Sequence, residues 1–271
     1  MKLGMAAIAG IGFGALITGA LVRAGAPKRE TKNATQAPPT LNYWNGRGLM
    51  EVPRMCFVVN GSFPGKGFVD NKTNSPSGDL ASNLGRMPNI ETSEGGIGQG
   101  MACNFYAASV NNLMGDSLFQ SAKVMEMLGH ISELKDVWYK IVPYGSEPSQ
   151  EDLDKFFDSG GSDTEGVAQS RGERFLTWYL GRINAAITGT NGFAVGNRLS
   201  LADLVLYNVF AEFLTKEENA DRPDFKRHQF ADAARTAALV SKYPKIQSSI
   251  DQVKANANIQ KWIATRGPQN F

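Results

Sequence analysis

Residues 41–54 read LNYWNGRGLMEVPR, and this stretch organises the first half of the chain. A short apolar strand ends at the aromatic pair Tyr43 and Trp44, and the turn NGRG follows at once. Glu51 and Pro53 then lead into an apolar run, which is typical of the first turn of a helix. This order places a phenol at the C-terminal end of a strand and beside a helix start.

Two interpretations of Tyr43 follow from this stretch alone. Free backbone N–H groups and the helix dipole attract anions to a helix start, so a phenol there could donate a hydrogen bond to a thiolate or an oxyanion. In the other interpretation, Tyr43 is a buried core residue at the end of a strand. The fourteen residues do not decide between the two.

The same stretch resembles the start of sigma-class glutathione transferases, the group that includes the glutathione-dependent prostaglandin D synthases. The family pattern is roughly LTYFNxRGRAExxR, and the matching positions are Leu41, Tyr43, Asn45, Arg47, Gly48, Glu51 and Arg54. The resemblance implies that Tyr43 is the catalytic residue. Leu49 stands where the family has a second arginine, and with Trp44 it is expected to contact a hydrophobic substrate.

A second segment at the family spacing resembles the glutathione site. Met87-Pro88-Asn89-Ile90 stands for the family's Ile-Pro-Ile-Leu, in which the proline is cis, and Gln99-Gly100 stands for its Gln-Ser at a helix start. The implied glutathione-binding residues are Tyr43, Gly85, Arg86, Met87, Gln99, Gly100 and Glu133, with Pro88 in a structural role. Glu133 would act on the ligand of a neighbouring subunit. Glutathione is the expected co-substrate.

The second half of the chain is predicted to be almost wholly helical. Apolar residues recur at helical spacing over 104–113, 117–141, 171–187, 201–214, 230–240 and 244–262. Within FAVGNRLSLADLVLYNVF at 193–210, Ser200 is expected to cap a helix and Asp203 to return a bond to the cap's own N–H. The wording of this motif is also similar to the glutathione transferase version.

These patterns together predict an α/β thioredoxin-like N-terminal domain and an all-α C-terminal domain, the glutathione transferase fold, preceded by one transmembrane helix. The predicted boundaries are an anchor at 1–23, a linker at 24–39, a glutathione-binding domain at 40–114 and a helical domain at 115–271.

The N-terminal segment 3–22 carries no charged residue. Twenty helical residues span about 30 Å, which matches the hydrocarbon core of a bilayer. A membrane anchor and a cleaved secretory signal are both compatible with it. More positive charge follows the segment than precedes it, so the anchor reading predicts a single-pass membrane protein whose soluble domain faces the cytosol, a matrix or a stroma.

Composition excludes several classes of protein. A net charge of +2 gives no reason to expect a nucleic-acid partner. The two histidines, His130 and His228, lie far apart without cysteine partners, so no zinc spacing can be assembled and no metal is expected.

Three functions are compatible with the sequence. The first is a membrane-anchored glutathione transferase that activates the thiolate with Tyr43 for attack on a hydrophobic electrophile or peroxide. The second is a catalytically weak or inactive accessory subunit of an organellar membrane complex, and the third is a secreted or lumenal binding protein. A homodimer and membrane-complex subunits are candidate partners.

Overall fold

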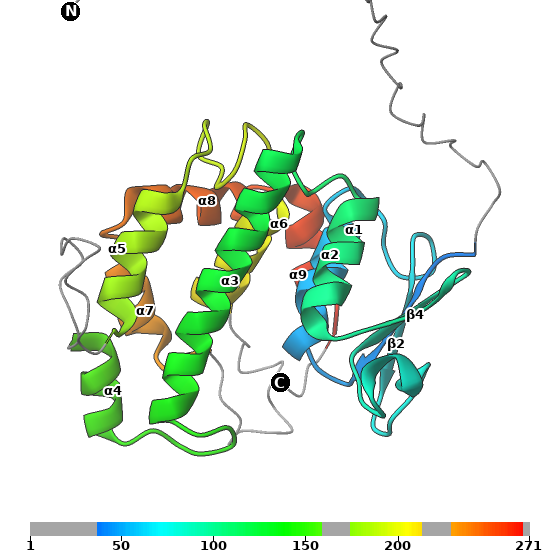
Figure 1. Ribbon diagram of the computed structural model, residues 1–271, viewed down its shortest axis with the longest axis horizontal. Coiled ribbons are helices and arrows are strands. Elements are labelled where there is room, and N and C mark those ends of the chain that lie inside the picture. Colours follow the sequence, from blue (N-terminus) through cyan, green and yellow to red (C-terminus); the bar gives the residue numbers. More distant parts are fainter. Residues whose placement is uncertain (1–36, 159–173, 213–228, 268–271) are drawn as a thin grey trace, which may run out of the picture. The chain divides into compact units, whose positions relative to one another are not determined.

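The computed structural model describes residues 37–158, 174–212 and 229–267. From Gln36 onward the chain forms one compact unit, in which a small sheet and two helices precede a set of packed helices (Figure 1). The predicted α/β domain followed by an all-helical domain is confirmed for these residues. The proposed boundaries at 40–114 and 115–271 stay predictions.

A four-stranded mixed sheet forms the first part of this unit, with the strand order β2-β1-β3-β4. β1 runs parallel to β2 and antiparallel to β3, and β3 and β4 form a hairpin. The strands are β1 (Thr40–Trp44), β2 (Val69–Thr73), β3 (Asn89–Thr92) and β4 (Gly95–Gly98). Leu41 and Tyr43 alternate with Asn42 along β1, so the apolar side chains face the helices and Asn42 faces the other way.

Asparagines cross the outer face of the sheet at matched positions on three strands. Asn42 pairs directly with Asn71 of β2 and with Asn89 of β3. The Asn71 side-chain amide donates to Oδ1 of Asn42 at 2.6 Å, and the Asn42 amide donates to Oδ1 of Asn89 at 3.0 Å. Asn89 donates in turn to the carbonyl of Ser77 at 3.0 Å. This amide ladder and the loop that contains Ser77 cover this face of the sheet, together with the short 3-10 helix Leu80–Asn83, which contacts β3 and β4.

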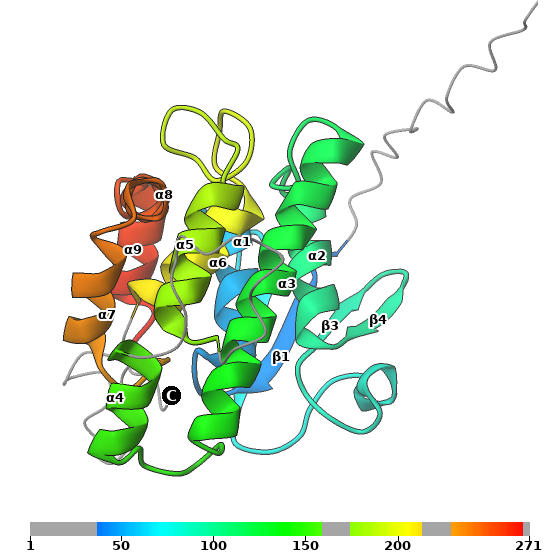
Figure 2. The same ribbon diagram turned by 60° about the vertical axis from the view of Figure 1, so that its left-hand side comes forward.

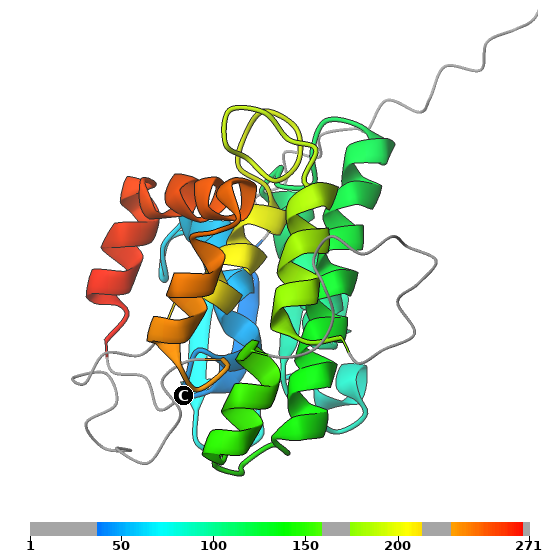
Figure 3. The same ribbon diagram turned by 90° about the vertical axis from the view of Figure 1, so that its left-hand side faces the viewer.

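The helices pack mainly on the opposite side of the sheet. Figures 1 and 2 show α1 and α2 beside it and the longer α3 beyond them, while Figure 3 shows α7, α8 and α9 gathered on the far side of α6. Their bounds are α1 (Glu51–Val58), α2 (Gly100–Val110), α3 (Leu118–Ile141), α4 (Gln150–Asp158), α5 (Leu176–Ala186), α6 (Leu201–Phe210), α7 (Ala233–Val240), α8 (Pro244–Lys254) and α9 (Ala257–Thr265). α1 contacts α2, α6 and α9, and it therefore joins the sheet to the helical part.

One helical prediction needs correction, and one helix was not predicted. The single helix predicted over 244–262 is two helices, because Asn256 turns out of the first and caps α9 by accepting from the N–H groups of Asn258 and Ile259, each at 3.0 Å. α4 was not predicted. It is held by Phe156, whose ring packs edge-on against Trp138 of α3 with the ring centres 4.8 Å apart.

The predicted localisation is also corrected. The segment 3–22 lies outside the described residues, and among the described helices none is long and apolar enough to cross a membrane. α3 is the longest of these, with 24 residues, but charged side chains such as Lys123, Glu126 and Glu133 interrupt it. The prediction of a single-pass membrane protein, with its soluble domain on the cytosolic, matrix or stromal side, is wrong by this finding.

Candidate functional site

Tyr43 is the penultimate residue of β1, and its hydroxyl lies against the turn that follows the strand. The side chain is 7% exposed, and the backbone N–H of Leu49 hydrogen-bonds to the hydroxyl oxygen. Burial raises the pKa of the Tyr43 phenol above its ordinary value, although the Leu49 N–H and the Arg54 guanidinium act in the opposite direction. The phenol is therefore protonated at neutral pH, and it can act as a hydrogen-bond donor.

The N-terminus of α2 lies beside this turn. A Cβ atom placed on Gly100, the first residue of α2, would lie 3.6 Å from Cβ of Leu49. Leu49 thus contacts both groups. Its backbone N–H meets the Tyr43 hydroxyl, and its side chain lies at the start of α2. The side chain is 54% exposed, so it offers apolar surface at this point. The sequence-predicted residues Tyr43, Leu49 and Gly100 are brought together in the structure.

Gln99 precedes α2 in a strained backbone conformation. Its φ of 68° and ψ of 130° lie in a region that non-glycine residues rarely adopt. Such a conformation costs on the order of 1–3 kcal/mol and persists where the surroundings impose it. Its side chain is exposed, and the helix start behind it presents free N–H groups.

The segment before β3 has the geometry that the resemblance implies. The Met87-Pro88 peptide bond is cis. Pro88 is buried, and its carbonyl accepts from the side-chain amide of Asn83 at 2.9 Å. Gly85 has a φ of 81°, and Gly85 and Arg86 are both exposed beside this turn.

Two other predicted residues are less closely tied to the site. Trp44 is half-buried against the hydrophobic core. Glu133 is exposed on α3, and its expected role needs a neighbouring subunit, so that role stays a prediction. In the described part of the chain, no group of three or more His, Cys, Asp or Glu residues could hold a metal ion.

Gly48 makes close approach to the Tyr43 phenol feasible. Its φ is +38°, and a Cβ atom at this position would lie 2.5 Å from the Tyr43 hydroxyl oxygen. We expect Gly48→Ala to lower the free energy of unfolding by about 2–4 kcal/mol, because backbone strain adds to a clash with the buried Tyr43 ring. Urea denaturation measures this loss.

Gly65→Ala is the matched control for that substitution. Gly65 also has a positive φ, of +81°, but no atom lies within 4 Å of the added Cβ. It should therefore show the backbone effect alone, about 1 kcal/mol. Equal losses in the two variants would contradict the inferred contact between Gly48 and the phenol.

The turn after Tyr43 is fixed by a buried arginine. Arg54 of α1 donates to the carbonyl of Gly46 at 2.7 Å, and its Nε donates to Asp70 of β2 at 2.9 Å. Its side chain is fully buried. The Asn45 N–H donates to Thr73 of β2 at 3.0 Å. Sequence reasoning assigned Arg54 only as a family match and missed this role.

Charged residues from the other end of the chain continue the same buried network. Glu51 accepts from the Trp262 indole at 2.7 Å and from Nη1 of Arg266 at 3.0 Å. Arg266 also contacts Glu212, which pairs with Arg47 of the turn at 2.9 Å. The i,i+3 spacing of Glu51 and Arg54 is a local signal for part of this network, whereas nothing near residues 212 and 266 indicates their partners.

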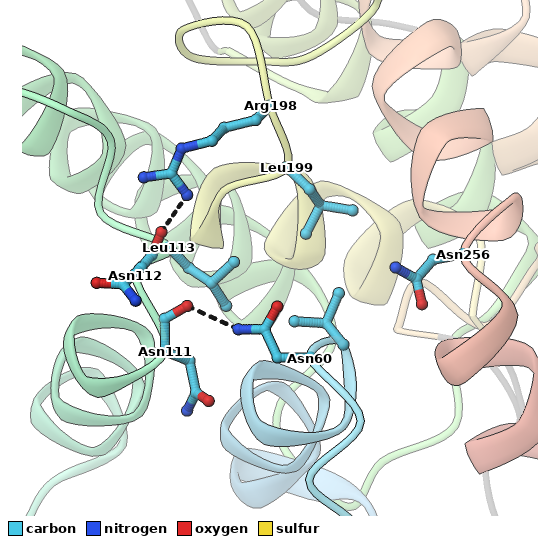
Figure 4. A pocket seen from close by; sticks show the side chains of 8 residues that line it. Asn60, Asn111, Asn112, Leu113, Arg198, Leu199 and Asn256 are labelled. Atoms are coloured by element: carbon cyan, nitrogen blue, oxygen red, sulfur yellow. Dashed lines mark hydrogen bonds between the residues drawn. The ribbon is translucent and has the colours of Figure 1, made fainter.

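A separate pocket was not predicted from the sequence. It has a volume of about 400 Å³ and lies where the ends of α1 and α2 meet the segment before α6 and the start of α9 (Figure 4). Asn60 donates across it to the carbonyl of Asn111 at 2.8 Å, and Arg198 contacts the carbonyl of Asn112. These bonds tie the end of α1 to the end of α2, and the segment before α6 to the end of α2. Its residues do not include those predicted for glutathione.

The predicted capping box at the start of α6 is confirmed. Asp203 accepts from the backbone N–H of Ser200 at 2.9 Å and from its hydroxyl at 2.7 Å. Both residues are buried, and they have a structural role.

Comparison with known proteins agrees with this fold. The family model "Glutathione S-transferase, C-terminal domain" matches residues 160–266. A probable glutathione S-transferase 5 of Caenorhabditis elegans is 23% identical over 83% of this chain and 95% of its own length. A putative glutathione S-transferase alpha-2 of Dictyostelium discoideum is 24% identical over 88% of this chain and 100% of its own length.

Solved structures show the same arrangement. The glutathione S-transferase Na-GST-3 of Necator americanus has a TM-score of 0.60 and 21% identity, over 87% of this chain and 100% of its own. Prostaglandin synthase D of Nilaparvata lugens has a TM-score of 0.56 and 16% identity, over 85% of this chain and 98% of its own.

The fold is thus the glutathione transferase fold, in which a small α/β domain precedes a helical domain. Residues 160–266 match the C-terminal domain of the glutathione S-transferase family, and over most of its length the chain is similar to glutathione S-transferases. These comparisons do not distinguish the sigma class from the others.

Proposed function

We propose that this protein is a sigma-like glutathione transferase in which Tyr43 activates the thiol of bound glutathione. The observation that carries the proposal is the position of the Tyr43 hydroxyl, which lies at the Leu49 N–H and beside the start of α2. Residues from about 40 to 114 would bind glutathione, and residues from 115 onward would cover the second substrate.

The chemistry follows from charge at this position. Free thiols titrate near pH 8.5, whereas the reactive species is the thiolate. A hydrogen bond from the protonated Tyr43 phenol favours the thiolate, and the positive end of α2 favours any nearby anion. Together they could lower the thiol pKa by roughly two units, about 2.7 kcal/mol. The sulfur would then attack an electrophilic carbon or the oxygen of a peroxide.

The other residues have proposed roles around the tripeptide. Met87, before the cis peptide bond, would pair its backbone with the cysteinyl unit, as an added strand does. Gln99 and the N–H of Gly100 would bind the γ-glutamyl carboxylate at the start of α2. Gly85 and Arg86 border the same segment, and Glu133 would reach the ligand of a second subunit if the protein is a homodimer.

The second substrate would be a hydrophobic small molecule. Leu49 is exposed beside the Tyr43 hydroxyl, and Trp44 is half-buried next to it in sequence. Leu49 supplies apolar surface where the family has an arginine. The positive charge of Arg54 still acts on the phenol, and it lowers the pKa of Tyr43. An inactive accessory subunit of a membrane complex is not favoured, because the named relatives are glutathione S-transferases and the described helices include no membrane span.

Replacing Tyr43 by phenylalanine tests the proposal. We expect the pKa of bound glutathione's thiol to rise by about one to two units, because the donor to the thiolate is lost. The pKa is measured from the ultraviolet absorbance of the thiolate as a function of pH, with the full chain and millimolar glutathione.

Tyr243→Phe serves as the control. It removes another buried phenol hydroxyl, which donates to the Thr177 carbonyl at 3.4 Å within the helical part. The thiol pKa should be unchanged in this variant. Failure of the natural protein to bind millimolar glutathione would contradict the transferase proposal, and an equal thiol pKa in Tyr43→Phe would contradict the role of Tyr43.

A further inference from the structure

Glu212 is a buried acid whose charge the proposed chemistry does not use. It follows α6, and its side chain is 3% exposed. One of its oxygens, Oε1, pairs with Nη1 of Arg47 at 2.9 Å and contacts Nη1 of Arg266. Arg47 belongs to the turn after Tyr43, so a residue of the helical part holds the candidate site directly.

The pair belongs to a closed ring of buried charges. From Glu212 the contacts run through Arg266 to Glu51, where Arg266 donates at 3.0 Å. Glu51 lies 3.5 Å from Nη1 of Arg54, and the same nitrogen donates to the carbonyls of Gly46 at 2.7 Å and Arg47 at 3.4 Å. The ring therefore begins and ends on the turn.

The charges of this ring nearly balance. Its three arginines face the carboxylates of Glu51 and Glu212, and Asp70 balances Arg54 from outside the ring. Four of its buried polar atoms have no hydrogen-bond partner in the described protein: Arg47 Nε, Glu51 Oε2, Arg54 Nη2 and Glu212 Oε2. Two are donors and two are acceptors. Buried polar atoms without partners are costly, which is unusual for a set whose only role is stability.

The turn that the ring holds sets the surroundings of Tyr43. Arg47 precedes Gly48, where an added Cβ atom would lie 2.5 Å from the Tyr43 hydroxyl oxygen, and the Arg47 carbonyl accepts from the N–H of Met50 at 3.1 Å. Between these residues, Leu49 presents its N–H to the Tyr43 hydroxyl. A shift of the Arg47 side chain would therefore change the hydrogen bond at the phenol without any contact to the ligand.

We propose that Glu212 is a positioning residue, which acts through Arg47 to hold the turn so that the Tyr43 hydroxyl and the Leu49 N–H keep their mutual geometry. For catalysis this inference rests on the proposed function, since the thiol to be activated is that of glutathione. Displacements of about 1 Å in a reacting group can cost up to a hundredfold in rate, so a small movement of the turn is sufficient.

The test compares Glu212→Gln, Arg47→Gln and the double variant in the full chain. The first readout needs no glutathione: it is the carbon-13 resonance of the Tyr43 ring carbon bonded to oxygen, assigned by its loss in Tyr43→Phe. We expect both single variants to shift this resonance in the same direction. The double variant should shift it no further than either one, because both remove the same ion pair.

The second readout is the bound thiol pKa. We expect it to rise by about one unit in each variant, which is about a tenfold loss of thiolate at neutral pH. The shorter Glu212→Asp keeps the charge, and it should fall between the natural protein and Glu212→Gln in both readouts. It also provides the comparison if Glu212→Gln does not fold.

Asp203→Asn is the control for a loss of stability alone. Asp203 is buried in the helical part, and its hydrogen bonds do not reach the turn. If the Glu212 variants lower the unfolding midpoint and leave the Tyr43 resonance where Asp203→Asn leaves it, Glu212 is only structural and the proposal is wrong. If the natural protein binds no glutathione, the transferase proposal fails, and the Tyr43 resonance alone still decides whether Glu212 positions the phenol.

Discussion

Replacing Glu51 by alanine is expected to lower the free energy of unfolding by about 3–5 kcal/mol, because it removes one member of a buried charge network and leaves its partners buried. Glu51 is completely buried. Its Oε1 accepts from the Trp262 indole at 2.7 Å and from Arg266 at 3.0 Å. The alanine variant leaves the indole N–H without its acceptor and leaves an excess of positive charge in the interior.

The pH dependence of this loss has a definite sign. Burial alone would raise the pKa of Glu51, but Arg266 and Arg54, with the Trp262 N–H, lower it below its ordinary value. The ionised carboxylate therefore stabilises the folded protein above the ordinary glutamate pKa, near 4.5. That contribution disappears as the pH falls through the depressed pKa. The difference between the natural protein and Glu51→Ala should narrow in acid.

Glu126→Ala is the matched control for Glu51. Glu126 lies on α3, where it pairs with Lys123 at 2.5 Å with both side chains partly exposed. An exposed pair of this kind contributes about 0.5 kcal/mol or less. Denaturant titrations of both variants at neutral pH measure the contrast. A loss in Glu51→Ala no greater than that in Glu126→Ala would contradict the role given to the buried network.

Replacing Asp203 by alanine is expected to cost about 3–5 kcal/mol, because it leaves several buried donors without an acceptor. Oδ1 accepts from the N–H of Ala194 and the hydroxyl of Ser249, each at 2.7 Å. Oδ2 accepts from the N–H of Ser200 at 2.9 Å and from its hydroxyl at 2.7 Å. One carboxylate thus joins the loop before α6, the start of α6 and α8.

Asp232→Ala separates this network from ordinary capping. Asp232 caps α7 through one bond, from the N–H of Arg235 at 2.9 Å, and it is only half-buried. Loss of such a cap costs about 1 kcal/mol. Thermal and urea unfolding of the two variants give the comparison. Similar losses would show that the extra bonds of Asp203 contribute little.

The sequence was sufficient for the parts of the site that are local. The strand, the turn and the helix start occupy consecutive positions in 41–54, and the capping box at Ser200 and Asp203 spans four residues. Hydrogen bonds over such short distances leave a readable spacing. The same argument holds for the hairpin of β3 and β4.

Contacts between residues far apart in the chain could not be predicted from local spacing. Arg47 and Glu212 meet across most of the chain, and each has ordinary surroundings in the sequence. The break between α8 and α9 was missed because apolar spacing continues through it, while Asn256 supplies an alternative acceptor for the backbone.

The amide ladder on the outer face of the sheet also fixes strand register. Hydrophobic faces specify register because a one-residue slip turns every side chain to the wrong side. Here the outward face adds a second, independent condition. A two-residue slip would keep the apolar residues inward, but it would separate Asn42 from both Asn71 and Asn89. The three asparagines therefore distinguish the native pairing from the nearest alternatives that burial alone permits, in a sheet whose strand β1 carries Tyr43.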